Sequence, residues 1–199
     1  MKVLFATAVD FNLPEADVIY YPEFLDKFSA DLLFDELLHQ TPWQQDNIRI
    51  FGKTYAQPRL TALFGNDGKS YSYSNITMQP HPWTESLQRI KSHIEKVSGA
   101  SFSTVLLNLY RDGKDSNGWH ADDEKELGIN PIIASLSLGA PRSFHLQHKS
   151  DKTLKQKIIL EHGSLLLMKG TTQHFWKHQI PKTARLVGPR INLTFRTII

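Results

Sequence analysis

Apolar residues at helical spacing predict a first helix over residues 30–40. Leu33 and Leu37 lie one helical turn apart and would share a buried face. Ser29 stands just before this stretch, where a hydroxyl oxygen can accept a hydrogen bond from a first-turn N–H. Pro42 cannot continue a helix. We therefore expect a helix over Ala30–Gln40 with Ser29 as its N-cap and Pro42 as its stop.

A second helical pattern covers residues 84–98. Its apolar positions recur every three or four residues, at Leu87, Ile90, Ile94 and Val97. Thr84 is a good N-cap residue, and Gly99 stands where a left-handed residue often ends a helix. This pattern predicts a helix that starts after Thr84 and stops at Gly99.

The rest of the chain reads as short strands. Residues 48–79 look extended, with a turn signal at 66–68 (Asn-Asp-Gly) and a period of two over 71–74 (Tyr-Ser-Tyr-Ser). After Gly99 the pattern predicts strands over Ser103–Arg111, Ile132–Leu138, Ser143–His148, Lys157–Leu160, Ser164–Met168 and Ile191–Ile198. Short strands at close spacing are typical of a sandwich or barrel. The expected fold class is therefore α+β, with a jelly roll that the two helices support.

Composition narrows the chemistry. The 199 residues are 40% hydrophobic and 22% charged, which fits one globular domain. No apolar run approaches the roughly 20 residues of a membrane-spanning helix, so we expect no membrane-spanning segment. There is no cysteine, which excludes disulfides, thiolate metal sites and a cysteine nucleophile. Any bound metal must use His, Asp or Glu, and the chain has nine histidines.

Charge is distributed unevenly along the chain. The formal net charge is +3, but residues 1–40 carry −6, residues 119–140 carry −3 and residues 141–199 carry +9. A basic body suits a polyanion such as nucleic acid, but on charge alone a solubilising lysine surface is the preferred explanation. Lys2 and the short apolar stretch 3–9 make a poor signal peptide. We expect an intracellular protein, cytoplasmic in a bacterium or nuclear in a eukaryote.

The triplet His120-Ala121-Asp122 is a candidate metal site. Alternate side chains of an extended segment point the same way, so this imidazole and carboxylate can bind one ion together. A second histidine would complete the two-His, one-carboxylate set of non-haem Fe(II) oxygenases. The candidates for it are His145, His148, His162, His174 and His178. Such a triplet also occurs as ordinary surface polar residues.

Residues 188–196 alternate in character along one strand. Arg190, Asn192, Thr194 and Arg196 share one face, and Ile191, Leu193 and Phe195 share the other. Two buried arginines need an anionic partner, and a guanidinium matches a carboxylate. The alternative is an edge strand whose polar face lies in water.

Together these stretches resemble the AlkB family of 2-oxoglutarate- and Fe(II)-dependent dioxygenases, and within it the nucleic-acid dealkylases of animal and bacterial type. The resemblance rests on residues 108–111, 119–124, 131–137, 162–166, 178–181 and 189–196, and extends through 58–61 and 71–74. The stretch Arg-Ile-Asn-Leu-Thr-Phe-Arg at 190–196 is highly specific, and the first 40 residues add little.

The resemblance implies the ligands and their residues. His120, Asp122 and His178 would bind Fe(II), with O2 as the oxidant, and Arg190 would pair with a carboxylate of 2-oxoglutarate. The remaining co-substrate residues would be Asn108, Tyr110, Asn192, Thr194 and Arg196. The implied reaction is oxidative demethylation of 1-methyladenine and 3-methylcytosine, with release of succinate, CO2 and formaldehyde.

It also implies substrate residues, each with an ordinary structural alternative. Asp123 would bind the exocyclic amino group of a flipped base, or be a surface acid. Tyr71, Ser72 and Tyr73 would belong to a recognition hairpin that holds the base, or be a half-buried strand face. Phe51, with Gly52 beside it, would wedge into the base stack, or be a core aromatic. Lys53 and Arg59 would contact phosphates.

These expectations give one dioxygenase domain over residues 1–199. Residues 1–47 form an N-terminal extension and helix, 48–79 the recognition hairpin region, and 100–199 the jelly-roll catalytic core. The stretch Phe-Gly-Lys at 51–53 resembles members that prefer duplex DNA. Residues 58–61 and 71–78 resemble members that prefer single strands and RNA, so strand preference stays open.

The expected partner is alkylated DNA, with RNA as a second candidate, and we expect a monomer that does not act at a membrane. Two other functions remain open. One is an Fe(II)/2-oxoglutarate hydroxylase or demethylase that acts on a target other than nucleic acid. The other is a nucleic-acid-binding module that keeps the fold without catalysis.

Overall fold

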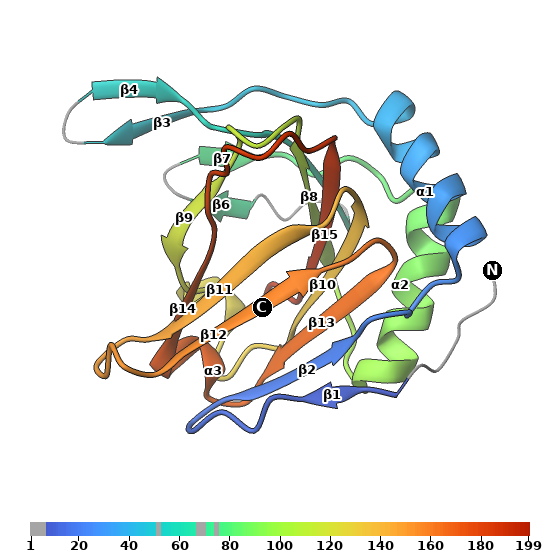
Figure 1. Cartoon of the computed structure of the whole chain (residues 1–199). Helices are drawn as coiled ribbons and strands as arrows, with labels where there is room; N and C mark the ends of the chain where they lie inside the picture. Colours follow the sequence, from blue (N-terminus) through green and yellow to red (C-terminus); the bar gives the residue numbers. More distant parts are fainter. Residues whose placement is uncertain (1–6, 51–52, 67–70, 74–75) are drawn as a thin grey trace.

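Two antiparallel sheets face each other in the computed structural model of the chain, and two helices cover the outer face of the larger sheet (Figure 1). The structure describes residues 7–50, 53–66, 71–73 and 76–199, with the backbone alone for 48–50, 71–73 and 76–77. The fold class is α+β with a jelly-roll core, as the sequence predicts.

The larger sheet has the order β1-β2-β13-β10-β15-β8-β5 in the described part of the chain. Its strands are β1 (Val9–Asp10), β2 (Asp17–Tyr21), β5 (Leu60–Gly65), β8 (Thr104–Tyr110), β10 (Ile133–Gly139), β13 (Ser164–Lys169) and β15 (Arg190–Arg196). β15 lies between β10 and β8, so both of its edges are hydrogen-bonded. This position excludes the edge-strand explanation of its polar face.

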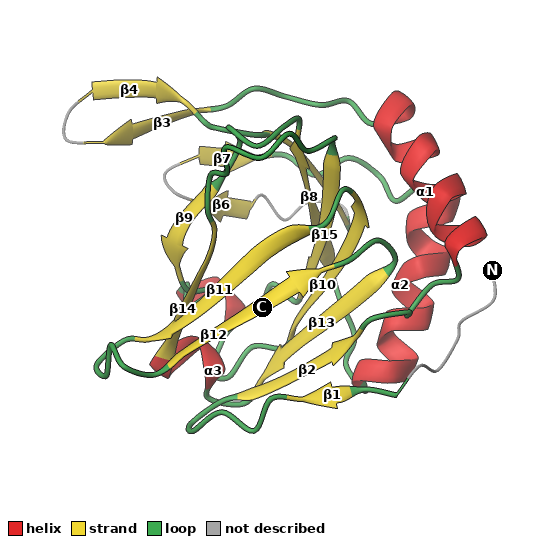
Figure 2. Cartoon of the chain, viewed as in Figure 1, coloured by secondary structure: helices red, strands yellow, loops and turns green. Residues whose placement is uncertain are grey.

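The smaller sheet has the order β12-β11-β14-β9. Its strands are β9 (Asn117–His120), β11 (Arg142–His148), β12 (Lys155–Leu160) and β14 (Trp176–Ile180). The short helix α3 (Thr172–Phe175) leads into β14, and the 3-10 helix η1 (Lys125–Leu127) follows β9. Two hairpins, β3 (Asn47–Ile50) with β4 (Lys53–Ala56) and β6 (Tyr71–Tyr73) with β7 (Ile76–Met78), lie beside the sheets (Figure 2).

Helices α1 (Lys27–Gln40) and α2 (Glu85–Ser98) pack on the larger sheet because each has one apolar face. Leu33 and Leu37 of α1, with Leu87 and Ile90 of α2, join Leu193 of β15 in one buried cluster. A second cluster fills the space between the two sheets. The alternate residues of β15 divide between these two sides, so the strand's apolar face meets the helices and its polar face lines the interior.

The helix ends test the capping predictions. α2 begins after Thr84, whose hydroxyl accepts from the Leu87 N–H at 3.3 Å, and stops at Gly99 in the left-handed conformation (φ 71°), as predicted. The predicted start of α1 is wrong. Its N-cap is Asp26, because the Asp26 carboxylate accepts from the Ser29 N–H at 2.9 Å and Ser29 already lies in the first turn.

The sequence missed several elements: β1, β2, β9, β14 and α3. The turn predicted at residues 66–68 lies mostly outside the described residues. None of the helices in the described part of the chain combines the length and apolar character that a membrane crossing needs.

Candidate active site

The three predicted metal ligands meet between the two sheets. His120 ends β9 and pairs in register with His178 on the neighbouring strand β14, while Asp122 lies two residues beyond β9. Their candidate ligand atoms all lie within 4.8 Å of one another. His178 Nε2 is 3.8 Å from Asp122 Oδ2, and the two imidazole centroids are 4.3 Å apart. The set therefore fits a metal that accepts two nitrogens and one carboxylate.

Hydrogen bonds fix the orientation of the His120 ring. Its Nδ1 lies 2.8 Å from the Gly118 carbonyl oxygen, which can only accept, so Nδ1 carries the proton. The lone pair of Nε2 then faces the pocket, where the Asn117 amide approaches it at 3.3 Å. This is the tautomer that a metal ligand needs, with the other ring nitrogen tied to the backbone.

Burial keeps both imidazoles ready to bind a cation. Burial, with the nearby His120, lowers the pKa of His178 to about 3. Burial also lowers the pKa of His120, against the opposing effect of Asp122. Both rings are therefore neutral at neutral pH, as metal ligation requires.

Asp122 is a buried carboxylate held in its charged form. Burial alone would raise its pKa, but the positive charge of Arg196 and its hydrogen bond bring the pKa of Asp122 below its usual value. Arg196 Nη2 donates to Asp122 Oδ1 at 2.6 Å. One carboxylate oxygen is thus engaged by Arg196, and the other faces His178.

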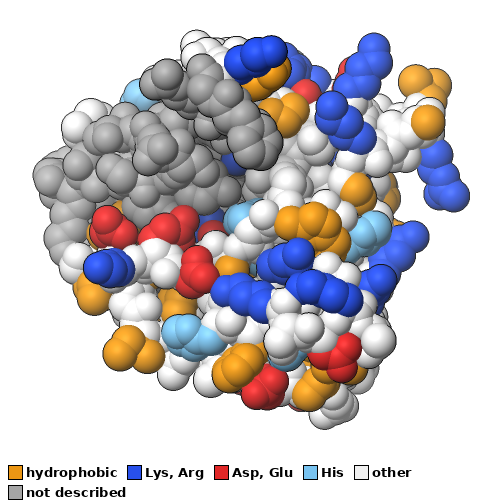
Figure 3. Space-filling view, turned by 90° about the vertical axis from the view of Figure 1, so that its left-hand side faces the viewer, with side chains coloured by type: hydrophobic (Ala, Val, Ile, Leu, Met, Phe, Trp, Pro, Cys, Tyr) orange, Lys and Arg blue, Asp and Glu red, His pale blue; other side chains and the backbone are white. Residues whose placement is uncertain are grey.

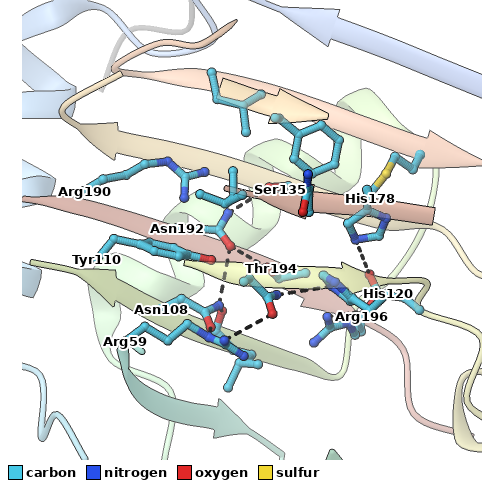
Figure 4. Close-up of a pocket in the computed structure, with 18 residues that line it drawn as sticks. Arg59, Asn108, Tyr110, His120, Ser135, His178, Arg190, Asn192, Thr194 and Arg196 are labelled. Carbon is cyan, nitrogen blue, oxygen red and sulfur yellow. Dashed lines mark hydrogen bonds and ion pairs between the residues drawn. The ribbon is translucent and has the colours of Figure 1, made fainter. Parts of the chain in front are cut away.

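Arg190 lies at the opposite end of the pocket, deeply buried (Figure 4). Its Nη2 donates to Ser137 Oγ at 2.8 Å, and its guanidinium lies 5.2 Å from the Tyr110 ring centroid. The atoms Nε and Nη1 have no hydrogen-bond partner among the described residues. Burial lowers the pKa of Arg190 to about 10, so the group is still a cation at neutral pH. A buried cation with two open donors fits a carboxylate ligand.

A ladder of polar side chains connects the two ends of the pocket. Asn192 donates to Ser135 Oγ at 2.8 Å and accepts from the Thr194 hydroxyl at 2.8 Å. Asn108, directly across the strand pair, donates to Asn192 at 3.4 Å. The pocket is lined by Arg59, Asn108, Tyr110, His120, Asp122, Ser135, His178, Arg190, Asn192, Thr194 and Arg196, among other residues. All the predicted metal and co-substrate residues are therefore brought together.

Arg59 occupies a different place from the one that a phosphate contact requires. It is buried, with 3% of its surface exposed, and it lines the same pocket. Its Nε donates to Asn108 at 2.8 Å and its Nη1 donates to Asn117 at 3.1 Å. Arg59 thus connects the polar ladder to Asn117, which in turn contacts His120.

Besides Arg59, the predicted substrate residues with described side chains are Lys53 and Asp123. Asp123 is exposed and pairs with Lys149 at 2.8 Å. Lys53 is exposed at the start of β4. Phe51 and Gly52 lie outside the described residues, and for Tyr71, Ser72 and Tyr73 only the backbone, in β6, is described.

Sequence reasoning missed Asn117, Ser135, Ser137, Lys149 and Gln173. Ser135 and Ser137 alternate with apolar residues on β10, and that alternation was the one available signal. Gln173 is fully buried, and its Oε1 accepts from the Asp122 N–H at 2.9 Å. Nothing in the local sequence around residue 173 indicates this contact.

Comparisons with known proteins agree with this geometry. A family model described as the 2OG-Fe(II) oxygenase superfamily matches residues 17–196. The chain is 46% identical over 190 residues to the alpha-ketoglutarate-dependent dioxygenase alkB homolog 3 of Homo sapiens, which covers 91% of this chain and 66% of that protein. It is 38% identical over 189 residues to the DNA oxidative demethylase ALKBH2 of Homo sapiens, covering 90% and 72%. The solved structure of OsALKBH1 matches with a TM-score of 0.61 at 17% identity, covering 90% of this chain and 97% of that one.

The chain therefore belongs to the AlkB family within the 2OG-Fe(II) oxygenase superfamily. It spans slightly less than two thirds of the length of its alkB homolog 3 relatives, 66% of the human protein and 64% of the Bos taurus protein. The structural match to OsALKBH1 supports the shared fold.

Proposed function

We propose that this chain is an Fe(II)- and 2-oxoglutarate-dependent dioxygenase that removes N-alkyl groups from bases in DNA, and in RNA as a second candidate polymer. One juxtaposition supports the proposal most directly. The set His120, Asp122 and His178 shares a buried pocket with Arg190, whose guanidinium has two donors without partners among the described residues. A metal and a dicarboxylate are the ligands that these two features fit.

His120, Asp122 and His178 would hold Fe(II), and Arg190 would hold a carboxylate of 2-oxoglutarate. When bound, Fe(II) and 2-oxoglutarate supply the oxidation of the N-alkyl group by O2, with release of succinate, CO2 and formaldehyde. The chain's contribution is position and electrostatics. Arg196 keeps the Asp122 carboxylate charged and oriented, and Tyr110 packs against the Arg190 guanidinium.

A nucleic-acid substrate suits the surface beside the pocket. Lys and Arg side chains gather on the side of the molecule that Figure 3 shows. Lys155 and Lys157 of β12 and Lys177 of β14 alternate with residues that face the interior. Lys177 Nζ lies 5.1 Å from the Trp119 ring centroid. Such lysines, one of them beside an exposed aromatic ring, match the phosphates and bases of a single strand.

The preferred lesions in this proposal are 1-methyladenine and 3-methylcytosine, with the carboxylate of Asp123 accepting from the exocyclic amino group of the flipped base. Phe51, Gly52, Tyr71, Ser72 and Tyr73 keep their predicted roles around that base. The relative named DNA oxidative demethylase ALKBH2 supports a DNA substrate.

The test measures succinate and formaldehyde with Fe(II), 2-oxoglutarate and ascorbate. The substrate is a 1-methyladenine oligonucleotide, single- or double-stranded, and the unmethylated strand is the control. We expect formaldehyde in a one-to-one ratio with succinate, and only with the methylated strand. Succinate that does not respond to methylated strands would point to a hydroxylase with another target. Neither product, with Mn(II) binding shown by calorimetry, would point to a binding module.

A further inference from the structure

Asp122 and Asp123 are adjacent carboxylates with different surroundings. Asp122 is 1% exposed and faces the candidate metal site, while the Asp123 side chain is 50% exposed and faces out of it. Neighbouring residues of an extended segment naturally point to opposite sides. This segment, however, belongs to no strand, since β9 ends at His120. Something other than a sheet ladder must hold the two carboxylates in their directions.

Gln173 holds the backbone of this segment. Its Oε1 accepts from the Asp122 N–H at 2.9 Å, and the side chain is fully buried. A buried amide costs free energy unless it is hydrogen-bonded, and an apolar residue of the same size would fill the space without that cost. The other end of the amide has the Met168 sulfur at 3.6 Å, a weak acceptor. The hydrogen bond to the Asp122 N–H is therefore the one strong contact that offsets the cost of burying the Gln173 amide.

Lys149 connects the Asp123 carboxylate to α3, the helix that contains Gln173. Its Nζ lies 2.8 Å from Asp123 Oδ2 and 2.8 Å from the Gln173 carbonyl oxygen. Its backbone N–H also donates to the Phe175 carbonyl at 2.7 Å, which fixes the base of the side chain against α3. One ammonium thus ties Asp123 to the residue whose side chain holds Asp122.

α3 is itself anchored from the other side. The Thr172 hydroxyl accepts from the Asp17 N–H at 2.9 Å, and the Trp176 indole donates to the Pro14 carbonyl at 2.9 Å. Both Thr172 and Trp176 are buried. A short helix with fixed ends is a rigid support for a contact that must keep its geometry.

We propose that Gln173 and Lys149 are positioning residues that hold the adjacent carboxylates apart, Asp122 toward the metal and Asp123 toward the substrate. Gln173 acts on metal affinity through the Asp122 backbone. Lys149 acts on recognition of the alkylated base through the Asp123 carboxylate, a part that rests on the proposed function. We call Asp122, Asp123, Lys149 and Gln173 the carboxylate clamp.

The Gln173 part is tested by calorimetry with Mn(II) alone. We expect Gln173→Met, which keeps the length of the side chain, to weaken Mn(II) binding about tenfold, as loss of an outer-shell contact does. Gln173→Asn is a second variant, since it keeps an amide but is too short to reach Asp122. Far-UV circular dichroism and the melting temperature show that each variant is folded. A folded Gln173 variant that binds Mn(II) as the wild type does would overturn this part.

The Lys149 part is tested by binding of methylated and unmethylated single strands to the Mn(II)- and 2-oxoglutarate-loaded protein. We expect Lys149→Met to weaken binding of the methylated strand about tenfold, the scale of a lost charge-assisted hydrogen bond, and the unmethylated strand much less. Mn(II) affinity should stay within about twofold. Lys155→Met, at an exposed lysine of β12, is the control for losing one positive charge. In the Asp123→Asn protein, Lys149→Met should cause little further loss of binding to the methylated strand, because the carboxylate that Lys149 contacts is already replaced.

Two results would overturn the Lys149 part. One is an equal loss on both strands, as Lys155→Met would give, and the other is an undiminished Lys149→Met effect in the Asp123→Asn protein. A wild-type protein with no preference for the methylated strand would refute the proposed substrate and this part with it. The Mn(II) affinities of the Gln173 variants would still decide the other part.

Discussion

Arg196 Nη2 lies 2.6 Å from Asp122 Oδ1, and both side chains are buried. The pair connects the last residue of β15 in the larger sheet to the segment that follows β9 in the smaller one. The carboxylate that would bind the metal is therefore charged and oriented in the metal-free protein. The same ion pair connects the two sheets. Stability and metal binding are coupled at this point.

We expect Arg196→Met to destabilise the metal-free protein by about 3–5 kcal/mol, because it leaves the Asp122 carboxylate buried without its partner. Urea denaturation in EDTA measures this loss, and Arg196→Lys, which keeps the charge, should lose less. Arg185→Met removes an exposed arginine and serves as the control. If Arg196→Met and Arg185→Met had the same free energy of unfolding, the ion pair between Arg196 and Asp122 would not stabilise the fold.

Arg190 should behave in the opposite way. Without 2-oxoglutarate its buried guanidinium has no ion-pair partner within the described residues, so Arg190→Met should leave the free energy of unfolding unchanged or raise it by about 1–2 kcal/mol. The same variant should raise the KM for 2-oxoglutarate by roughly 30-fold or more, the usual cost of losing a buried charged partner. Affinity for an oligonucleotide should hardly change. A comparable loss for both ligands would show that Arg190 does not select the co-substrate.

Arg59 and Lys53 give a matched pair of variants. Arg59 is buried and contacts Asn108, so Arg59→Met should raise the KM for 2-oxoglutarate and leave the salt dependence of oligonucleotide binding as it was. Lys53 is exposed, so Lys53→Met should lower the salt slope by about 1 if it contacts a phosphate. Oligonucleotide binding measured at several salt concentrations distinguishes the two variants. A reduced slope in Arg59→Met would restore the phosphate role that the sequence suggested.

Local pattern predicted much of the fold, and the resemblance to the AlkB family implied the metal and co-substrate residues that line the pocket. The alternation on β15 placed Arg190, Asn192 and Thr194 on one face, and that face lines the interior. The sequence could not show which of two surroundings this face meets, because that depends on β8 and β10, which pair with β15 from distant parts of the chain. The same limit explains why the residues alone left several histidines as candidates, and why only the resemblance singled out His178, which lies opposite His120 where β14 pairs with β9.

The elements that were missed lack a strong period. β14 has a lysine, a histidine and a glutamine among its five residues, and it is a strand because β11 and β9 flank it. At α1, Asp26 and Ser29 are both good caps, and in the fold the Asp26 carboxylate accepts from the Ser29 N–H and from its hydroxyl. Gln173 and Lys149 act through contacts across long sequence separations, which no local pattern records.

The depressed pKa of His178 predicts how stability depends on pH. In the unfolded chain this histidine takes a proton near pH 6.5, whereas in the fold its pKa is about 3. Between these values the unfolded state binds more protons, so the free energy of unfolding must fall as pH falls from about 6.5 toward 3, by up to about 1.4 kcal/mol per pH unit for this group. His120 contributes in the same direction, because its pKa is also lowered. Asp122 contributes only at lower pH, below the usual range of a carboxyl group.

Urea denaturation in EDTA at pH 7, 6 and 5 tests this dependence. The free energy of unfolding should fall less steeply with falling pH for His178→Gln than for the wild type. His39→Gln, on the exposed face of α1, is the control for losing one histidine. Equal slopes for wild type and His178→Gln would mean that the buried imidazole takes up its proton without opening the fold.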